Sequence, residues 1–228
     1  MSAIEEAIDM LRHGKFVLVH DDKGREDEID MVIAAEYITP NNIATMRNDA
    51  GGLLCLAISN EITTKLGLAY MHDIIQSLSS INPIFSKLTD GKSPYGDKPS
   101  FSIAINHRDT YTGITDIDRA LTISKMAEIC KKIDSGGVEE FAKNFRTPGH
   151  VPILIASKGL LEERRGHTEL CVYLAQMSKL APAVVICEML DSTTHRALSI
   201  NKAKEYADIK GITLLEASQL KTHAKAAY

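Results

Sequence analysis

The stretch from Asp21 to Asp30 constrains the fold of this 228-residue chain more than any other. It reads DDKGREDEID and holds six carboxylates and two cations in ten residues, between the apolar runs 16–19 and 31–35. A charge cluster of this kind usually lies on a solvated surface. Apolar runs of this length on both sides are typical of buried strands. A purely solvated role therefore fits this stretch poorly.

Strand geometry predicts which of these charges share a face. If residues 28–35 form a strand, the side chains of Glu26, Glu28 and Asp30 point to one side, because successive side chains alternate. Three carboxylates so close stay ionised only if a cation or hydrogen-bond donors compensate them, or else one has a raised pKa. Both outcomes suit a hard metal ion that works with a general base.

The composition limits what these carboxylates belong to. With 44% hydrophobic residues, the chain has enough apolar material for one sizeable core, and we expect a single domain over residues 1–228. The net charge of −4, without a basic and aromatic cluster, argues against nucleic-acid binding. The acidic, amphipathic start and the lack of any long apolar run predict neither a targeting segment nor a membrane span.

Cysteine spacing points to the same kind of protein. The four cysteines at 55, 130, 171 and 187 are too far apart in sequence for a zinc or redox CxxC pair. We expect them to be reduced thiols in a cytoplasmic protein.

Periodicity and capping signals predict alternating helices and strands. Ser2 and Glu5 form a capping box for a first helix that Gly14 ends. Segment 79–99 is rich in Ser, Pro, Gly and Lys and is expected to be a long loop, functional or merely tolerated. The pattern favours an α+β or α/β fold with a mixed sheet under helices. The expected helices are 2–13, 40–48, 59–66, 123–133, 138–145, 168–179 and 200–210, and the expected strands are 16–19, 28–35, 53–58, 101–106, 151–156, 183–188 and 212–215.

A second polar constellation is Arg164-Arg165-Gly166-His167-Thr168-Glu169. It stands where a loop enters a helix, so free backbone N–H groups and the helix dipole favour an anion, with Arg164 as a bidentate partner. His167 offers an imidazole that could complete a metal site with Glu26. A histidine at a helix start is as often a surface or capping residue, so the motif alone leaves both interpretations open.

Three further segments carry polar groups in unusual places. Residues 147–150 are expected to form a turn that presents His150 before a buried strand. Glu188 ends an apolar strand, where a glutamate is either paired or functional. Segment 112–116 could add phosphate contacts, although helix capping explains it more simply.

With these motifs in place, the chain resembles the 3,4-dihydroxy-2-butanone 4-phosphate synthase family from its first helix to about residue 215. Six motifs carry the resemblance: DDKGREDEID, AGGLLC at 50–55, TGITDIDRA at 112–120, RTPGHV at 146–151, RRGHTE at 164–169 and ICEM at 186–189. The resemblance implies conversion of D-ribulose 5-phosphate to L-3,4-dihydroxy-2-butanone 4-phosphate and formate in riboflavin biosynthesis. It also implies Mg²⁺, with Mn²⁺ as an alternative, and homodimers with active sites near the subunit interface.

The resemblance also implies a role for individual residues. The metal ligands are Glu26 and His167. The catalytic residues are Glu28, Asp30, His150 and Glu188, which share the acid–base steps of enolisation, skeletal rearrangement and loss of C4 as formate. The substrate-binding residues are Arg25, Glu26, Asp30, Cys55, Thr112, Arg164, Arg165, Gly166, His167, Thr168 and Glu188.

Two residues depart from the family pattern, and two other functions remain as alternatives. Ile29 and Arg165 stand where many members have glycine; Ile29 is expected to face away from the carboxylates, and Arg165 either crowds the phosphate loop or strengthens it. Some relatives carry a fused GTP cyclohydrolase II domain, whose cysteine cluster is missing here, so we expect a monofunctional enzyme. The alternatives are a Mg²⁺-dependent sugar-phosphate isomerase or aldolase, and a non-catalytic nucleotide- or RNA-binding relative.

Overall fold

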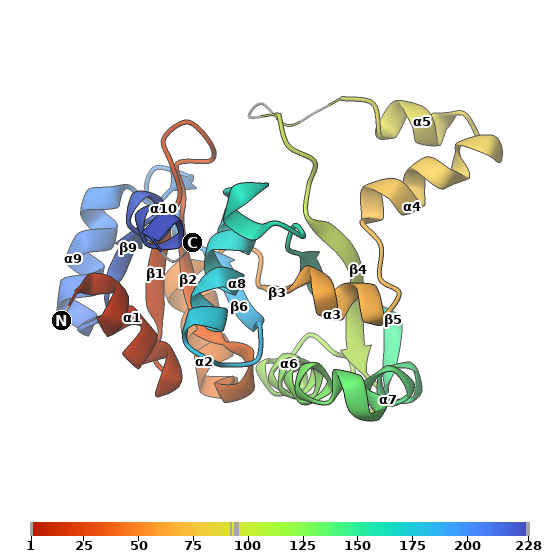
Figure 1. Ribbon diagram of the computed structural model, residues 1–228, viewed down its shortest axis with the longest axis horizontal. Helices are drawn as coiled ribbons and strands as arrows, with labels where there is room; N and C mark the ends of the chain where they lie inside the picture. Colours follow the sequence, from red (N-terminus) through yellow and green to blue (C-terminus); the bar gives the residue numbers. More distant parts are fainter. Residues whose placement is uncertain (1, 92, 94–95, 227–228) are drawn as a thin grey trace.

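The centre of the fold is one mixed sheet, seen in the computed structural model of the chain, which describes residues 2–91, 93 and 96–226 (Figure 1). Neighbouring strands pair antiparallel except for β1 with β9 and β3 with β5, which are parallel. Across the sheet the strands are β4 (Phe101–His107), β5 (Phe145–Ile155), β3 (Cys55–Ile58), β6 (Ala183–Glu188), β2 (Ile29–Ala34), β1 (Val17–His20) and β9 (Leu214–Glu216).

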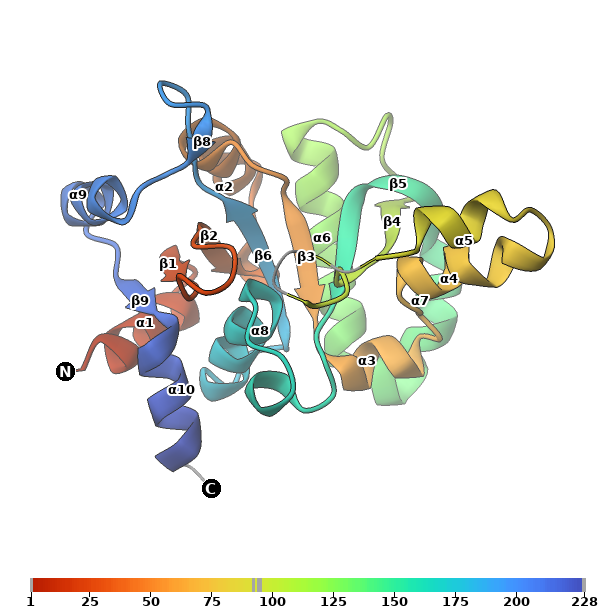
Figure 2. The same ribbon diagram turned by 90° about the horizontal axis from the view of Figure 1, so that it is seen from above.

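Helices cover both faces of this sheet, and a small hairpin lies outside it. Figure 2 shows α2, α6 and α9 on one side and α1, α8 and α10 on the other. The hairpin consists of β7 (Leu190–Asp191) and β8 (Arg196–Ala197). The helices are α1 (Ala3–Arg12), α2 (Pro40–Thr45), α3 (Asn60–Lys65), α4 (Met71–Ser77), α5 (Ile84–Leu88), α6 (Asp116–Lys131), α7 (Val138–Asn144), α8 (His167–Met177), α9 (Ile200–Lys210) and α10 (Ala217–Ala226).

Side-chain alternation divides the buried residues between two cores. In β2, Met31 and Ile33 join the core under α2 and α6, whereas Val32 joins the core under α1 and α8. Asp30 has the parity of Val32 and therefore faces α8. Ile29 lies in the opposite core, away from the carboxylates, as predicted. The strand thus keeps its charged and apolar side chains on separate faces.

Register brings a second acid to the same face. Asp30 of β2 lies opposite Glu188 of β6, and Cys55 of β3 lies opposite Ile186 of β6. Adjacent strands are only about 5 Å apart. The three central strands therefore deliver Asp30, Glu188 and Cys55 to one region at the start of α8.

Local capping signals predicted several helix ends correctly. The Ser2 hydroxyl accepts the Glu5 N–H and the Glu5 carboxylate accepts the Ser2 N–H, which completes the capping box. Gly211, in the left-handed region at φ 61°, ends α9 at the predicted residue. The mixed α and β architecture is confirmed. Among the described residues, no helix is long and apolar enough to cross a membrane.

The prediction that residues 79–99 form one loop was wrong in part. Helix α5 lies within it, and α4, which precedes it, was not predicted at all. Figure 1 shows both helices standing away from the sheet layers. Neither helix has a buried residue, and Leu88 of α5 is more than two-thirds exposed, so these short helices lack the buried stripe that makes helical periodicity readable. Residues 92, 94 and 95 of the predicted loop lie outside the described residues.

The expected turn at residues 147–150 is instead an irregular part of β5. Ile105 pairs with Val151, and the next residue of β4, Asn106, pairs with Arg146, so four residues of β5 bulge out between these pairs. Helix α6 begins seven residues before its predicted start, because Thr115 caps it by accepting the Asp118 N–H. Helix α10 was not predicted.

Gly149 permits the close approach of β5 to β4 at this bulge. A Cβ at this position would lie 2.0 Å from the carbonyl carbon of Ile105 and 2.4 Å from the Asn106 nitrogen, and both are backbone atoms that cannot step aside. We expect Gly149→Ala to reduce the free energy of unfolding by about 1–3 kcal/mol through overpacking. Gly24→Ala, with nothing within 4 Å of its Cβ, is the matched control. Thermal unfolding measures both, and equal melting temperatures would contradict this account.

Candidate active site

The acidic loop between β1 and β2 is held in shape by its own first carboxylate. Asp21 is buried; its Oδ2 accepts the Glu26 N–H and its Oδ1 accepts the Glu28 N–H, each at 3.1 Å. Lys221 of α10 pairs with Asp22 in the same loop. The loop is therefore held by hydrogen bonds to Asp21 and by the ion pair of Asp22 with Lys221, and these contacts determine where Glu26 and Glu28 point.

Three side chains from this loop and α8 converge on one point. Ligand atoms of Asp21, Glu26 and His167 all lie within 4.8 Å of one another. His167 Nε2 lies 3.1 Å from the Glu28 carbonyl oxygen, and a carbonyl only accepts, so Nε2 carries a proton. Nδ1, 3.3 Å from Glu26 Oε2, is then the nitrogen that can bind a cation. Two carboxylates and one imidazole suit Mg²⁺, which prefers hard oxygen ligands.

Asp30 is the least compensated charge of the site. Its side chain is buried, and its Oδ1 has no hydrogen-bond partner among the described residues and lies 3.9 Å from His167 Nε2. Burial raises the pKa of this carboxyl to about 7, the nearby carboxylates Glu188, Glu26 and Glu28 add to the rise, and His167 opposes it. An orphaned oxygen on a group that titrates near neutrality indicates a place where a ligand or a transferred proton belongs.

The negative charges of the site also raise the pKa values of His167 and Glu28. Burial disfavours protonation of the His167 imidazole, but Asp30, Glu26 and Asp21 outweigh that cost and raise its pKa to about 10. A metal ion that binds at Nδ1 therefore displaces a proton from it. Burial, followed by the charges of Glu26 and Glu188, raises the pKa of Glu28. Carboxyls with raised pKa values beside a histidine form a set that can store and pass protons at neutral pH.

Glu188 has hydrogen-bond partners, which is one of the two outcomes that its strand-end position left open. Its Oε2 accepts the Leu53 N–H at 2.7 Å, and its backbone carbonyl accepts the Gly52 N–H at 3.0 Å. A Cβ on Gly52 would lie 2.5 Å from both Glu188 oxygens, so only glycine leaves room for this carboxylate. Burial raises the pKa of the adjacent Cys55 thiol, with help from Glu188 and Asp30, and keeps it protonated.

The second half of the site is an anion cradle at the start of α8. Gly166 is the N-cap and has no side chain to occupy the free N–H groups of the first turn. A Cβ on Gly166 would lie 2.4 Å from Arg164 Nη1 and 3.0 Å from Arg25 Nη2, so both guanidinium groups lie over this glycine. Arg164 Nη1 donates to the buried Glu169 at 2.6 Å.

The structure brings most of the predicted site residues together. Glu28 and Gly166 adjoin a cavity of about 90 Å³, and Ser100, Phe101, Leu154 and Ile186 complete its wall. The predicted residues that line this cavity are Glu26, Asp30, Cys55, Arg164, His167, Thr168 and Glu188.

Three predicted residues lie elsewhere. His150 and Thr112 are exposed and share one partner, Asn106, which contacts His150 Nδ1 at 3.1 Å and the Thr112 carbonyl at 3.4 Å. Arg165 is exposed and lines a separate groove with Lys221 of α10. Neither His150 nor Thr112 lines the cavity at Glu26.

Sequence reasoning missed three members of the site. Asp21 belongs to the acidic run that was singled out, but only the folded loop turns it toward Glu26 and His167. Glu169 was quoted in the motif RRGHTE without a role, although it holds Arg164. Asp97 contacts Arg25 and Arg164 from segment 79–99, where no local pattern marks it.

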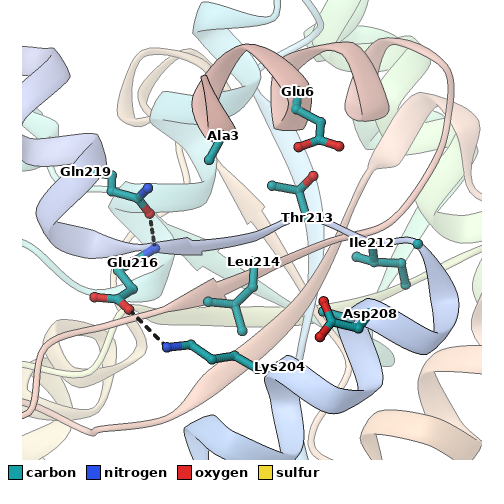
Figure 3. Close-up of a pocket in the computed structure, with 11 residues that line it drawn as sticks. Ala3, Glu6, Lys204, Asp208, Ile212, Thr213, Leu214, Glu216 and Gln219 are labelled. Carbon is teal, nitrogen blue, oxygen red and sulfur yellow. Dashed lines mark hydrogen bonds and ion pairs between the residues drawn. The ribbon is translucent and has the colours of Figure 1, made fainter. Parts of the chain in front are cut away.

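A wider groove of about 700 Å³ lies between α1, α9, β9 and α10 (Figure 3). Its polar groups are largely engaged with one another: Lys204 pairs with Glu216 at 3.8 Å, and Gln219 accepts the Glu216 N–H at 2.8 Å. None of the predicted site residues lines it. Its size therefore does not make it the candidate active site.

Known proteins share both the sequence and the fold of this chain. The family model of 3,4-dihydroxy-2-butanone 4-phosphate synthase matches residues 5–223. Enzymes of that name from Archaeoglobus fulgidus and Methanothermobacter thermautotrophicus are 44% and 45% identical, over 96% and 95% of this chain and 92% and 93% of their own lengths. A crystal structure of 3,4-dihydroxy-2-butanone 4-phosphate synthase in complex with two magnesium ions is 28% identical, with a TM-score of 0.77, over 99% of this chain and 98% of its own.

The anion cradle can be tested through Gly166. We expect Gly166→Ala to weaken binding of inorganic phosphate about tenfold, because the new methyl group pushes two guanidinium groups aside. The melting temperature should fall as well, because the displaced Arg164 Nη1 donates to the buried Glu169. Gly159→Ala, in the preceding loop, is the control. Calorimetric titration with phosphate measures the effect, and unchanged affinity would contradict the assignment of the cradle.

Proposed function

The chain belongs to the 3,4-dihydroxy-2-butanone 4-phosphate synthase family, and from this premise we propose that the cavity at Glu26 and His167 is its active site. The chain is a lyase of riboflavin biosynthesis that converts D-ribulose 5-phosphate to L-3,4-dihydroxy-2-butanone 4-phosphate and formate. The comparisons do not favour the isomerase, aldolase or binding-protein alternatives. We further propose that residues 1–228 act as one synthase domain.

One observation carries the proposed site: Asp21, Glu26 and His167 gather beside the orphaned Oδ1 of Asp30. Glu26 and His167 would hold Mg²⁺, and Asp21 is near enough to assist. The same donors also accommodate Mn²⁺. A bound ion supplies Lewis-acid stabilisation of negative charge on the substrate's oxygens. The chain's own side chains then supply binding and proton transfer.

Acid–base work falls to the carboxyl groups with raised pKa values. Removal of the C3 proton of the ketose needs a base that is partly ionised at neutral pH, and Asp30, with a pKa of about 7, meets that requirement. Glu28 lies in the same field and can hold a second proton. Glu188, oriented by the Leu53 N–H, faces both and completes a set for successive transfers.

Substrate orientation falls to the opposite end of the cavity. Arg25, Arg164 and the first-turn N–H groups of α8 would bind the phosphate, with Thr168 beside them. Fixing the phosphate there directs the carbon chain toward Asp30 and Glu26. Burial raises the pKa of Cys55 and keeps its thiol protonated, so Cys55 forms part of the cavity wall and does not act as a nucleophile.

We expect Glu26→Gln to reduce kcat/KM for formate release at least a thousandfold, because it removes a charged metal ligand (about 4 kcal/mol). Asp27→Asn is the matched control, because Asp27 belongs to the same loop but its Oδ1 lies 3.0 Å from His20 Nε2. Asparagine tolerates the positive φ of 55° at this position. The assay measures formate from ribulose 5-phosphate with magnesium and with chelator. Activity of Glu26→Gln near the wild-type level, or activity indifferent to chelation, would refute the metal assignment.

We also propose a homodimer. His150 and Thr112 belong to family motifs but lie on an exposed patch outside the cavity of their own chain. A two-fold dimer would let this patch of one subunit face the cavity of its partner, so that each active site draws on both chains. In solution the assembly should have twice the mass of one 25.0 kDa chain.

Mixed dimers test this arrangement. Glu26→Ala and His150→Ala should each be inactive alone. Equal amounts, unfolded and refolded together, should recover about a quarter of wild-type activity, since half of the dimers are mixed and each mixed dimer has one intact site. Separately refolded variants that are then mixed on ice are the control. A monomeric mass, or no recovery from mixed dimers, would overturn the shared site.

The cysteines support our proposal of a cytoplasmic location. All four are free and buried in the structure. Reduced thiols are the normal state of cysteine in the cytosol.

A further inference from the structure

Asp97 bridges the two arginines of the anion cradle. Its Oδ2 lies 2.5 Å from Arg25 Nη1 and 3.5 Å from Arg164 Nε. Asp97 comes from the segment before β4, whereas Arg25 comes from the acidic loop and Arg164 from the loop before α8. One carboxylate thus joins three segments at the point where both guanidinium groups meet over Gly166.

Arg164 pairs with two carboxylates, Glu169 and Asp97, and they differ in how easily each could move away from it. Glu169 is fully buried on α8 and also accepts the Ser157 N–H at 2.9 Å, so it cannot leave without stranding a charge. The Asp97 side chain is 31% exposed. Among the described residues, its backbone hydrogen bonds go to Ser93, whose hydroxyl lies 3.1 Å from the Asp97 nitrogen. Asp97 is therefore the partner that can be replaced.

Asp97 and Arg164 also stand between two cavities. The metal-side cavity, about 90 Å³, shares Ser100 and Arg164 with an outer cavity of about 280 Å³ that Asp97 helps to line. A typical small-molecule site occupies roughly 300 Å³ or more. Neither cavity alone reaches that size, but the two together do. The ion pairs of Asp97 lie on the boundary between them.

We propose that Asp97 is a specificity-determining residue that occupies the phosphate position of the cradle until the substrate's phosphate displaces it. This rests on the proposed function, which assigns Arg25 and Arg164 to the substrate phosphate. Displacement releases the two arginines to the phosphate and joins the two cavities into one site.

The difference in negative charge favours replacement of Asp97 by the substrate's phosphate at Arg25 and Arg164. A phosphate monoester carries close to two negative charges and three acceptor oxygens, against one charge and two oxygens for Asp97, so it pairs better with two guanidinium groups. Both anions cannot share the cradle, because like charges at contact distance repel. A sugar without phosphate has no charge to displace Asp97 and leaves the cradle closed. Asp97 therefore selects phosphorylated substrates by competition.

The test compares Asp97→Asn with Asp134→Asn in the whole 228-residue chain. Asparagine keeps the shape of the side chain but removes the competing charge. Asp134 pairs with Lys65 at 2.8 Å and lines neither cavity, and no contact joins it to either arginine in the described part of the chain. Inorganic phosphate is titrated calorimetrically without magnesium, and formate release gives KM and kcat separately.

We expect Asp97→Asn to bind inorganic phosphate about tenfold more tightly than wild type and to show a lower KM without a higher kcat. Asp97→Glu, which restores the charge, should return both values toward wild type. Asp134→Asn, outside both cavities, should leave them unchanged. If Asp97 had no role in phosphate binding, Asp97→Asn would change neither the phosphate affinity nor the KM.

Weaker phosphate binding or a raised KM in Asp97→Asn would overturn the proposal, because the carboxylate would then support the bound arrangement of the arginines. Unchanged affinity would overturn it as well. The phosphate titration does not depend on catalysis, so it decides the role of Asp97 even if the wild-type protein releases no formate. In that event the proposed function fails separately.

Discussion

The concentration of negative charge in one small volume is the constraint on which the rest of the structure depends. Asp21, Glu26, Glu28, Asp30 and Glu188 would drive one another apart if each faced the interior without partners. The backbone N–H groups offered to Asp21, the Leu53 N–H offered to Glu188 and the imidazole of His167 prevent this. The negative charge of Asp30 is compensated only in part, because its Oδ1 has no hydrogen-bond partner among the described residues. Asp30 is therefore the carboxylate best placed to accept a proton or contact a ligand.

Strand alternation makes this arrangement compatible with a stable core. Each acid on β2 and β6 is followed by an apolar side chain on the other face, so the core beneath α2 and α6 receives none of these charges. The polar side faces the N-terminus of α8, whose dipole favours anions. One face of the sheet is therefore apolar at these strand ends, whereas the other carries the reactive site beside the second core, under α1 and α8.

Local chemistry made much of this predictable. Strand β6 and helix α9 have the predicted limits, because an apolar run marks the strand and Gly211 marks the end of the helix. The meeting of Glu26 with His167 followed from motifs and not from periodicity. Asp97 and the bulge at Gly149 were beyond prediction from sequence, since each is defined by contact with a distant segment. Helices α4 and α5 were missed because they bury too little to show a pattern.

The position of β6 has a consequence for biosynthesis. This strand, Ala183–Glu188, lies between β2 and β3 and pairs with both, although it is made long after them. A nascent chain on the ribosome therefore holds two strands with open edges until residue 188 emerges, and open edges invite association with other chains. Glu26 and His167, 141 positions apart, also meet only at that late stage. The joining of the two halves of the sheet by β6 and the assembly of the reactive centre therefore both come late, shortly before β9 adds the last strand of the sheet.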